Sequence, residues 1–269
     1  MSHRLRSIFA IARTTVIEQI RNRLYLVILF FGGLVLVASA LLGALAPGHR
    51  TRVIFDLGLV TLELFGLATA IFGAVSLVLQ ETESKTIYLI LTRPVDRSTY
   101  ILGRFLGLIV AVACTMLAMA VFHVGVLMWD MEYFREFTEG WSFAQIYPLL
   151  LLMSMGKMFI TAAIALFFSL FATSQVSALV FTSSFWIAGH FGPEMRFLID
   201  KGTAPGATKT FIKTIAALLP NFQYFNFRDL FQTPGFSGWA FMGTAGIYCV
   251  GYTGFFLVLS TLWFSRKEF

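Results

Sequence analysis

The segment QETESKTIYLILTRPVDRSTYILGRF (Gln80–Phe105) lies between two long apolar runs of the chain. It carries seven charged side chains: Glu81, Glu83, Lys85, Arg93, Asp96, Arg97 and Arg104. Charges and irregular backbone are very costly in the hydrocarbon of a bilayer, so a segment of this kind must lie in water. We interpret it as a polar loop that joins two transmembrane helices.

The polar segment also has a local pattern of its own. Its apolar residues predict a short amphipathic helix that begins at Ser84 or Thr86 and ends at Leu91. Pro94 disfavours helical backbone at the residue before it, so we expect the chain to turn there. Ser98 has the chemistry of an N-cap for the long helix that follows.

The composition of the chain is that of a membrane protein. Hydrophobic residues make up 58% and charged residues 13% of the sequence, against about 45–50% and about 25% in soluble domains. A soluble fold with this composition would expose large apolar patches. The net charge of +6 does not indicate a nucleic-acid partner, because the basic residues cluster at the ends of apolar segments, where membrane topology explains them.

The apolar runs predict an all-α membrane protein with six transmembrane helices in a single domain, residues 1–269. A helix of about 20 apolar residues is long enough to cross the hydrocarbon core. The six runs occupy residues 24–46, 57–79, 105–129, 147–168, 176–191 and 239–264. The fifth run is short for a span.

Two further segments flank these spans. Residues 1–23 place apolar side chains at three- and four-residue steps and arginines mostly elsewhere, which predicts an amphipathic helix in a membrane interface. The alternative is a helix that packs as in a soluble protein. Residues 192–238 contain four prolines, so we expect short external helices that rest on the bilayer or dip into it.

The distribution of basic residues predicts the orientation. In a six-span protein the two termini and the polar segment lie on one side, and that side carries more Lys and Arg than the two shorter loops opposite. The long segment 192–238 also contains basic residues, which reduces the difference between the two sides. The flank of the first span is strongly basic, however, and the first span has the largest influence on orientation. We therefore expect both termini and residues 81–100 to be cytoplasmic.

Three ionisable side chains lie inside predicted spans: Glu63, His123 and Lys157. The helical rise places all three in the outer half of the bilayer, at overlapping depths. Because an unpaired charge is costly there, we expect Glu63 and Lys157 to approach each other with His123 nearby. This polar cluster either faces a translocation pathway or is a structural ion pair, and a lysine that snorkels into a wet crevice is a further alternative.

No catalytic, cofactor or metal site is predicted. The sequence S-M-G-K-M at residues 154–158 lacks the first glycine and the final Ser/Thr of a phosphate-binding loop, so we do not expect this chain to hydrolyse ATP. Methionines scattered through the spans are typical of packing rather than of soft-metal ligands. No residue pattern supports an enzyme, although a membrane-embedded enzyme or scaffold protein that acts without ATP stays open as the alternative function.

Several residues of the polar segment form a recognisable pattern, with an acidic residue, a Leu-Thr-Arg-Pro core and a Gly-Arg pair. They are Glu81, Thr86, Leu91, Thr92, Arg93, Pro94, Val95, Arg97, Tyr100, Gly103, Arg104 and Gly107. With these features the segment resembles the cytoplasmic loop between the second and third spans of ABC-2 type permeases, the membrane subunits of ATP-driven transporters. The resemblance extends more weakly over the whole pattern of spans, although the loop after the first span is shorter than in many members.

The resemblance implies that residues 81–100 are a coupling loop that docks on a separate ABC ATPase subunit. The residues it assigns to this contact are Glu81, Glu83, Lys85, Ile87, Tyr88, Leu91, Arg93, Pro94 and Arg97. ATP and Mg²⁺ would bind to that partner, and this chain would hold no cofactor itself.

The resemblance further implies two ATPase copies and a second permease chain, expected to form a homodimer, in the cytoplasmic (inner) membrane of a bacterium. Membrane lipids surround such a complex, and a periplasmic accessory protein is a further partner that it allows. Closure of the two ATPases would alternate access and move a substrate, usually by export. The cargo itself is not readable from the sequence.

Overall fold

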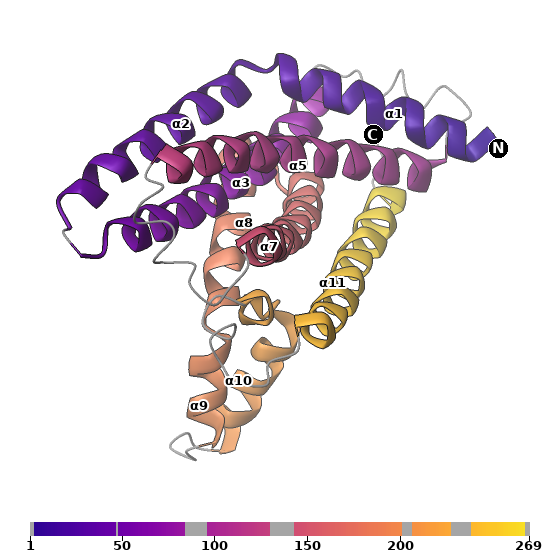
Figure 1. Ribbon diagram of the computed structural model, residues 1–269. Helices are drawn as coiled ribbons and strands as arrows, with labels where there is room; N and C mark the ends of the chain where they lie inside the picture. The colour runs from indigo at the N-terminus through magenta and orange to yellow at the C-terminus, as the bar shows by residue number, and fades with distance from the viewer. Residues whose placement is uncertain are drawn as a thin grey trace.

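The computed structural model describes residues 3–46, 48–83, 96–129, 143–200, 206–226 and 238–266 (Figure 1). All regular elements in these ranges are helices, and no strand occurs in them. The elements are α1 (His3–Arg21), α2 (Arg23–Ala44), α3 (Arg50–Glu83), α5 (Arg97–Trp129), α7 (Phe143–Phe171), α8 (Gln175–His190), α9 (Gly192–Asp200), α10 (Gly206–Leu218), the 3₁₀ helix η1 (Phe222–Phe225) and α11 (Gly238–Arg266).

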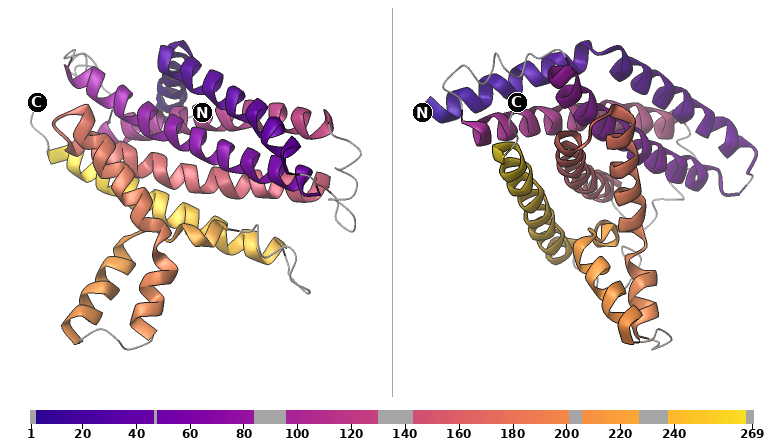
Figure 2. Two further views of the ribbon diagram at one scale, coloured as in Figure 1. Left: turned by 90° about the vertical axis from the view of Figure 1, so that its left-hand side faces the viewer. Right: turned by 180° about the vertical axis from the view of Figure 1, so that it is seen from behind.

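Five helices of the described ranges are long and apolar enough to cross a membrane: α2, α3, α5, α7 and α11. The prediction of an all-α membrane protein that crosses the bilayer several times is therefore confirmed. The fifth predicted span, residues 176–191, corresponds to α8, which has only 16 residues. Such a helix is about 24 Å long, short of the ~30 Å hydrocarbon core. Figure 2 shows the long helices from two further sides.

Several helices begin earlier than predicted. α3 begins at Arg50, before the predicted span start at residue 57. α5 begins at Arg97, which precedes both the start predicted after Ser98 and the predicted span start at Phe105. The prediction of Ser98 as an N-cap is wrong, because the backbone carbonyl of Asp96 already accepts the Tyr100 N–H at 3.1 Å. Charged residues mark where a chain leaves hydrocarbon, but a helix continues into water as long as its backbone bonds are satisfied.

The N-terminal helix α1 packs along the first turns of α5. Gly103 and Gly107 of α5 allow the close approach: a Cβ on Gly107 would lie 2.6 Å from the Ala12 carbonyl oxygen and 2.5 Å from the Thr15 Cβ. Part of the apolar stripe of α1 is left uncovered, since Leu5 and Phe9 are 46% and 60% exposed. A helix is therefore present at residues 3–21, while its position in a membrane interface stays a prediction.

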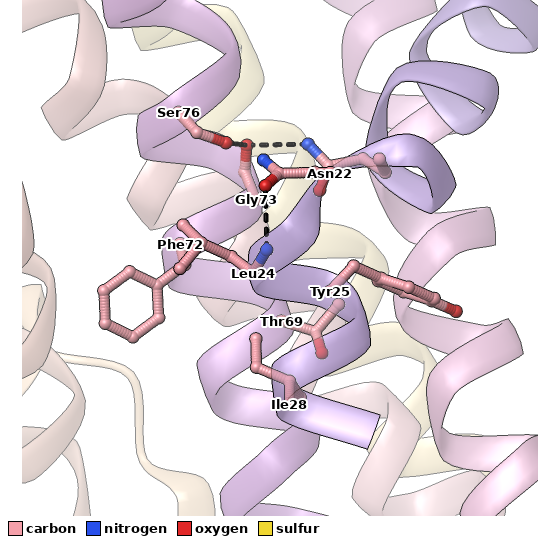
Figure 3. A pocket seen from close by; sticks show the side chains of 9 residues that line it. Asn22, Leu24, Tyr25, Ile28, Thr69, Phe72, Gly73 and Ser76 are labelled. Atoms are coloured by element: carbon pink, nitrogen blue, oxygen red, sulfur yellow. Dashed lines mark hydrogen bonds between the residues drawn. The ribbon is translucent and has the colours of Figure 1, made fainter. Parts of the chain in front are cut away.

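The junction of α1 and α2 is fastened to α3. Gln19 Nε2 and Ser76 Oγ both donate to the backbone oxygen of Gly73, at 3.1 and 3.2 Å. The side chain of Asn22 caps α2 by accepting the Leu24 N–H at 3.0 Å (Figure 3). The pocket between these residues has a volume of about 10 Å³, which leaves room for one water at most. We assign it no ligand.

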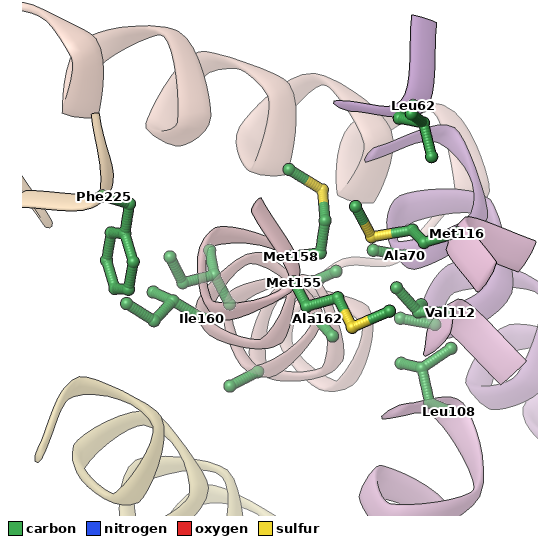
Figure 4. Packing of buried hydrophobic residues seen from close by; sticks show 14 of the residues in the cluster. Leu62, Ala70, Leu108, Val112, Met116, Met155, Met158, Ile160, Ala162 and Phe225 are labelled. Carbon is green, nitrogen blue, oxygen red and sulfur yellow. The ribbon is translucent and has the colours of Figure 1, made fainter. Parts of the chain in front are cut away.

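The apolar core lies around α7, whose middle is enclosed by α3, α5, α8 and α11 (Figures 1 and 4). Met158 of α7 and Met116 of α5 are both fully buried in it, and Met155 lies close by. Met116 also packs against Gly66 of α3. The methionines of the spans thus fill irregular gaps between helices, as expected of unbranched, adaptable side chains.

The segment between α8 and α11 leaves the bundle and returns to it. Helices α9 and α10 form a hairpin that projects away from the other helices in Figures 1 and 2. The chain then turns back through Pro220, and η1 is buried against the bundle by Phe222 and Phe225. Short helices before the last long helix were predicted, and α9, α10 and η1 are short helices in that segment. That they lie outside the membrane or at its surface stays a prediction.

Candidate functional site

An ion pair links α3 to α7 inside the bundle. The Lys157 Nζ donates to Glu63 Oε1 at 2.8 Å, and the two side chains are 10% and 25% exposed. The structure therefore brings together two of the three intramembrane ionisable residues of the sequence. Each charge offsets much of the desolvation cost of the other, which explains how both can lie inside an apolar core.

The ion pair borders a cavity of about 250 Å³, which we call the mid-bundle cavity. Its lining comes from α3 (Leu59, Val60, Glu63), α7 (Leu150, Ser154, Lys157), the end of α8 (His190) and the η1 segment (Phe222, Gln223, Phe225, Asn226). The volume is just below the roughly 300–1,000 Å³ of small-molecule pockets. Polar and apolar side chains share the lining, as in sites that hold the polar part of a ligand.

The mid-bundle cavity lies halfway along α7. Lys157 is separated by 14 residues from each end of this helix, or roughly 21 Å. Phe225 of η1 packs directly on Gly156 at the same level, and the thiol of Cys249 in α11 lies 3.6 Å from the Gly156 carbonyl oxygen. The η1 segment, a four-residue 3₁₀ helix between residues outside any helix, therefore returns to the middle of the bundle. Such irregular backbone is tolerated there only if protein or a wet cavity covers it.

Two tyrosines of α11 hold this returning segment. The Tyr248 hydroxyl accepts the Asn221 N–H at 2.6 Å, and the Tyr252 hydroxyl donates to the Leu219 carbonyl oxygen at 3.1 Å. On the other side, Gly189 of α8 gives the Phe222 ring room to pack. These contacts fix the position of the η1 segment relative to Lys157.

His123 does not join the Glu63–Lys157 pair. It is fully buried, with Nδ1 3.0 Å from the Tyr147 hydroxyl and Nε2 3.3 Å from the Ile54 carbonyl oxygen. Gly58 of α3 leaves room for its ring. His123 is thus a hydrogen-bonded core histidine nearer the start of α3, and the expectation that it lies beside the ion pair is corrected.

His190 takes the place that the sequence suggested for His123. Its Nδ1 lies 2.9 Å from the Trp186 carbonyl oxygen, and its ring packs between Trp186 and Phe222 with centroids 4.3 and 5.1 Å away. Sequence reasoning missed it because His190 ends an apolar run and nothing in its local sequence places it beside Lys157. The short length of the apolar run at residues 176–191 could have indicated this, because a helix of that length ends at His190, about halfway along α7.

The predicted coupling residues fall in three groups. Glu81 and Glu83 belong to the last turn of α3. Lys85, Ile87, Tyr88, Leu91, Arg93 and Pro94 lie outside the described residues, as does the predicted amphipathic helix at residues 84–91. Arg97 is the first residue of α5, and its guanidinium donates to the carbonyl oxygens of Phe264 and Ser265 at 2.6 and 2.7 Å.

Three helices meet where the polar segment joins α5. Besides the contact of Arg97 with α11, Arg4 of α1 donates to Ser98 at 2.9 Å and lies 3.4 Å from an Asp96 carboxylate oxygen. Further along α5, the buried Arg104 donates to Glu18 and Thr15 of α1 at 2.5 and 2.9 Å. The two terminal helices and the start of α5 are therefore tied together at one end of the bundle.

Among the described residues, no group of three or more His, Cys, Asp or Glu side chains is arranged to hold a metal ion. The sequence matches the family model described as ABC-2 family transporter protein over residues 55–262. No curated protein sequence matches the chain.

Proposed function

The chain belongs to the ABC-2 family of transporter proteins, and we propose that it is the permease subunit of an ATP-driven transporter. The observation that carries the proposal is the family match over residues 55–262, which includes α5, α7 and almost all of α11. A permease of this kind provides the membrane pathway, while a separate ABC ATPase binds ATP and Mg²⁺ and supplies the energy.

The end of the bundle where α1, α5 and α11 meet is suited to receive that ATPase. The segment with the coupling pattern connects α3 to α5 there, and its neighbour Arg97 is bonded to α11. A force applied to the segment would reach two terminal helices through Arg97 and Arg4. We propose that this end is cytoplasmic, in agreement with the basic residues that surround it.

The connectivity of the helices supports a path with six crossings. From the end that holds Arg97, α5 leads away and α7 returns, so that α8 starts near the same end. α11 must come back to that end, because its last residues contact Arg97. We propose that the chain crosses once more between Phe171 and Gly238, and that α8 forms the first part of this crossing.

In the proposed assembly, two copies of this chain and two ATPase copies work together in a bacterial inner membrane. Alternating access, driven by closure of the ATPases, would move a substrate across, with export as the proposed direction. The side of α2 and α11 that faces away from the bundle is largely apolar, with Phe30 and Ile247 67% and 77% exposed. Lipid or the second chain can cover such a surface. A periplasmic accessory protein remains an additional proposed partner.

The test is co-purification of the tagged chain with the ATPase encoded by a neighbouring reading frame, followed by measurement of ATPase activity in nanodiscs. We expect the permease to stimulate ATP hydrolysis, and Arg93→Glu or Leu91→Asp to abolish the stimulation. Glu136→Lys, in the loop predicted to lie on the opposite side, is the matched charge-reversal control and should leave the stimulation unchanged. A chain that is active alone in detergent and binds no ATPase would contradict the proposal and favour a membrane enzyme or scaffold.

A further inference from the structure

The polar groups of the mid-bundle cavity are only partly used by the protein. The Lys157 ammonium has three N–H donors, and one of them is bonded to Glu63 Oε1. Within the described ranges, neither the other Glu63 oxygen nor the Ser154 hydroxyl has a hydrogen-bond partner in the protein, and both residues line the cavity. These groups reach the cavity, so water or a polar ligand there can form the hydrogen bonds that the protein does not supply.

The η1 segment also has side-chain hydrogen-bonding groups without a partner among the described residues of the protein. Asn226 Nδ2 donates to Gln223 Oε1 at 3.2 Å, which leaves the Gln223 amide nitrogen as a donor and the Asn226 amide oxygen as an acceptor towards the cavity. This backbone could have stayed outside the bundle, yet two tyrosines of α11 hold it level with Lys157. Broken backbone that carries polar groups to the middle of a bundle is a feature of substrate sites in transporters.

The charges of the lining determine which ligand fits. A simple anion at Lys157 would be repelled by Glu63, whose nearer oxygen is only 2.8 Å from the ammonium. A simple cation at Glu63 would be repelled by Lys157 for the same reason. A group that carries both charges meets an opposite charge at each end, and it leaves the net charge of the site unchanged.

We propose that the mid-bundle cavity binds a zwitterionic group, with its anionic oxygens at Lys157, Ser154 and Gln223 and its ammonium at Glu63 and Asn226. A phospholipid headgroup with an ethanolamine and a free zwitterion of similar size share this chemistry. Phe222 and Phe225 bound the same cavity, and aromatic faces suit the methylene groups beside an ammonium. This inference deepens the proposed function and rests on it, because it identifies the class of molecule that the permease would hold.

The proposal can be tested on the purified full-length chain without its ATPase. Native mass spectrometry of the chain in detergent, with equal amounts of phosphatidylethanolamine and phosphatidylglycerol of the same acyl chains, measures the preference between a zwitterionic and an anionic headgroup. We expect one retained phosphatidylethanolamine with a preference of about tenfold, or about 1.4 kcal/mol. Equal retention of the two lipids would overturn the proposal.

The double variant Glu63→Gln/Lys157→Met removes both charges without leaving either one unpaired, so it should fold. It should lose the preference for phosphatidylethanolamine. The matched control is Arg52→Met/Asp56→Asn, which removes an exposed ion pair on the same helix α3 and should keep the preference. A preference that survives in Glu63→Gln/Lys157→Met would overturn the proposal.

The exchange Glu63→Lys/Lys157→Glu tests the polarity of the site, because it keeps an ion pair but reverses its direction. We expect the preference to be lost, and its retention would contradict the assigned orientation. Competition with glycerophosphoethanolamine, which has no acyl chains, separates the two sources: displacement indicates that the headgroup suffices, and retention of the lipid indicates that its tails also bind. If the lipid preference is absent in a chain that still stimulates its ATPase, the inference fails and the proposed function stands.

Discussion

Arg97, at the start of α5, donates a hydrogen bond of 2.6 Å to the backbone carbonyl oxygen of Phe264, near the end of α11. A second bond of 2.7 Å reaches the Ser265 carbonyl oxygen, and the guanidinium also lies over the Phe264 ring, 5.8 Å from its centroid. The last carbonyl groups of a helix have no partners within it and carry a partial negative charge. Arg97 therefore caps α11 in trans and joins the polar segment to the last helix.

Arg97→Ala should loosen the last turn of α11. Charged hydrogen bonds and a cation at a helix C-terminus contribute about 1–3 kcal/mol, so we expect amide hydrogen exchange over residues 261–266 to accelerate while the middle of α11 is unchanged. Arg97→Lys should show a smaller effect, since a lysine keeps the charge but lacks the planar fork. Arg13→Ala, at an exposed arginine of α1, is the control. Unchanged exchange in Arg97→Ala would refute the capping role.

The contact between Arg104 and Glu18 is a short ion pair that links α5 to α1. The Arg104 side chain is 5% exposed and bonded to Glu18 at 2.5 Å, whereas Glu18 itself is 46% exposed. Glu18→Ala leaves a buried guanidinium without its carboxylate, which should lower the free energy of unfolding by about 1–3 kcal/mol. Thermal unfolding in detergent measures this, with Glu194→Ala on the exposed side of α9 as the control. Equal melting temperatures for the two variants would show that the ion pair is negligible.

The long helices of this fold can be predicted from the sequence, because a long apolar segment in a bilayer must satisfy its own backbone hydrogen bonds and a helix does so. Their ends do not, as Arg50 and Arg97 show: nothing local forces a helix to stop where hydrocarbon ends. The pairing of Glu63 with Lys157 follows from the cost of burying a lone charge. The cavity positions of His190 and Gln223 could not be predicted in this way. They depend on where α8 ends and on how η1 packs back into the bundle, and tertiary packing decides both.

The Glu63–Lys157 pair also allows a prediction about stability. Lys157→Met alone leaves a carboxylate in the bundle with its ammonium removed, so it should destabilise the protein more than Glu63→Gln/Lys157→Met, which removes both charges. We expect the melting temperature of the double variant to lie above that of Lys157→Met and near that of the wild type. Additive losses in the double variant would show that the two residues are not energetically coupled.

The last prediction concerns the glycine contact between α5 and α1. In Gly107→Ala the new methyl group would lie 2.6 Å from the Ala12 carbonyl oxygen and 2.5 Å from the Thr15 Cβ. Because a backbone atom cannot rotate away, α1 must move, at a cost of about 1–3 kcal/mol. Gly125→Ala in the same helix meets nothing within 4 Å and should be neutral or slightly stabilising, since alanine favours helix. Limited trypsin digestion at the arginines of α1 reports the difference: cleavage should be faster in Gly107→Ala than in Gly125→Ala, and equal rates would show that α1 does not depend on this close approach.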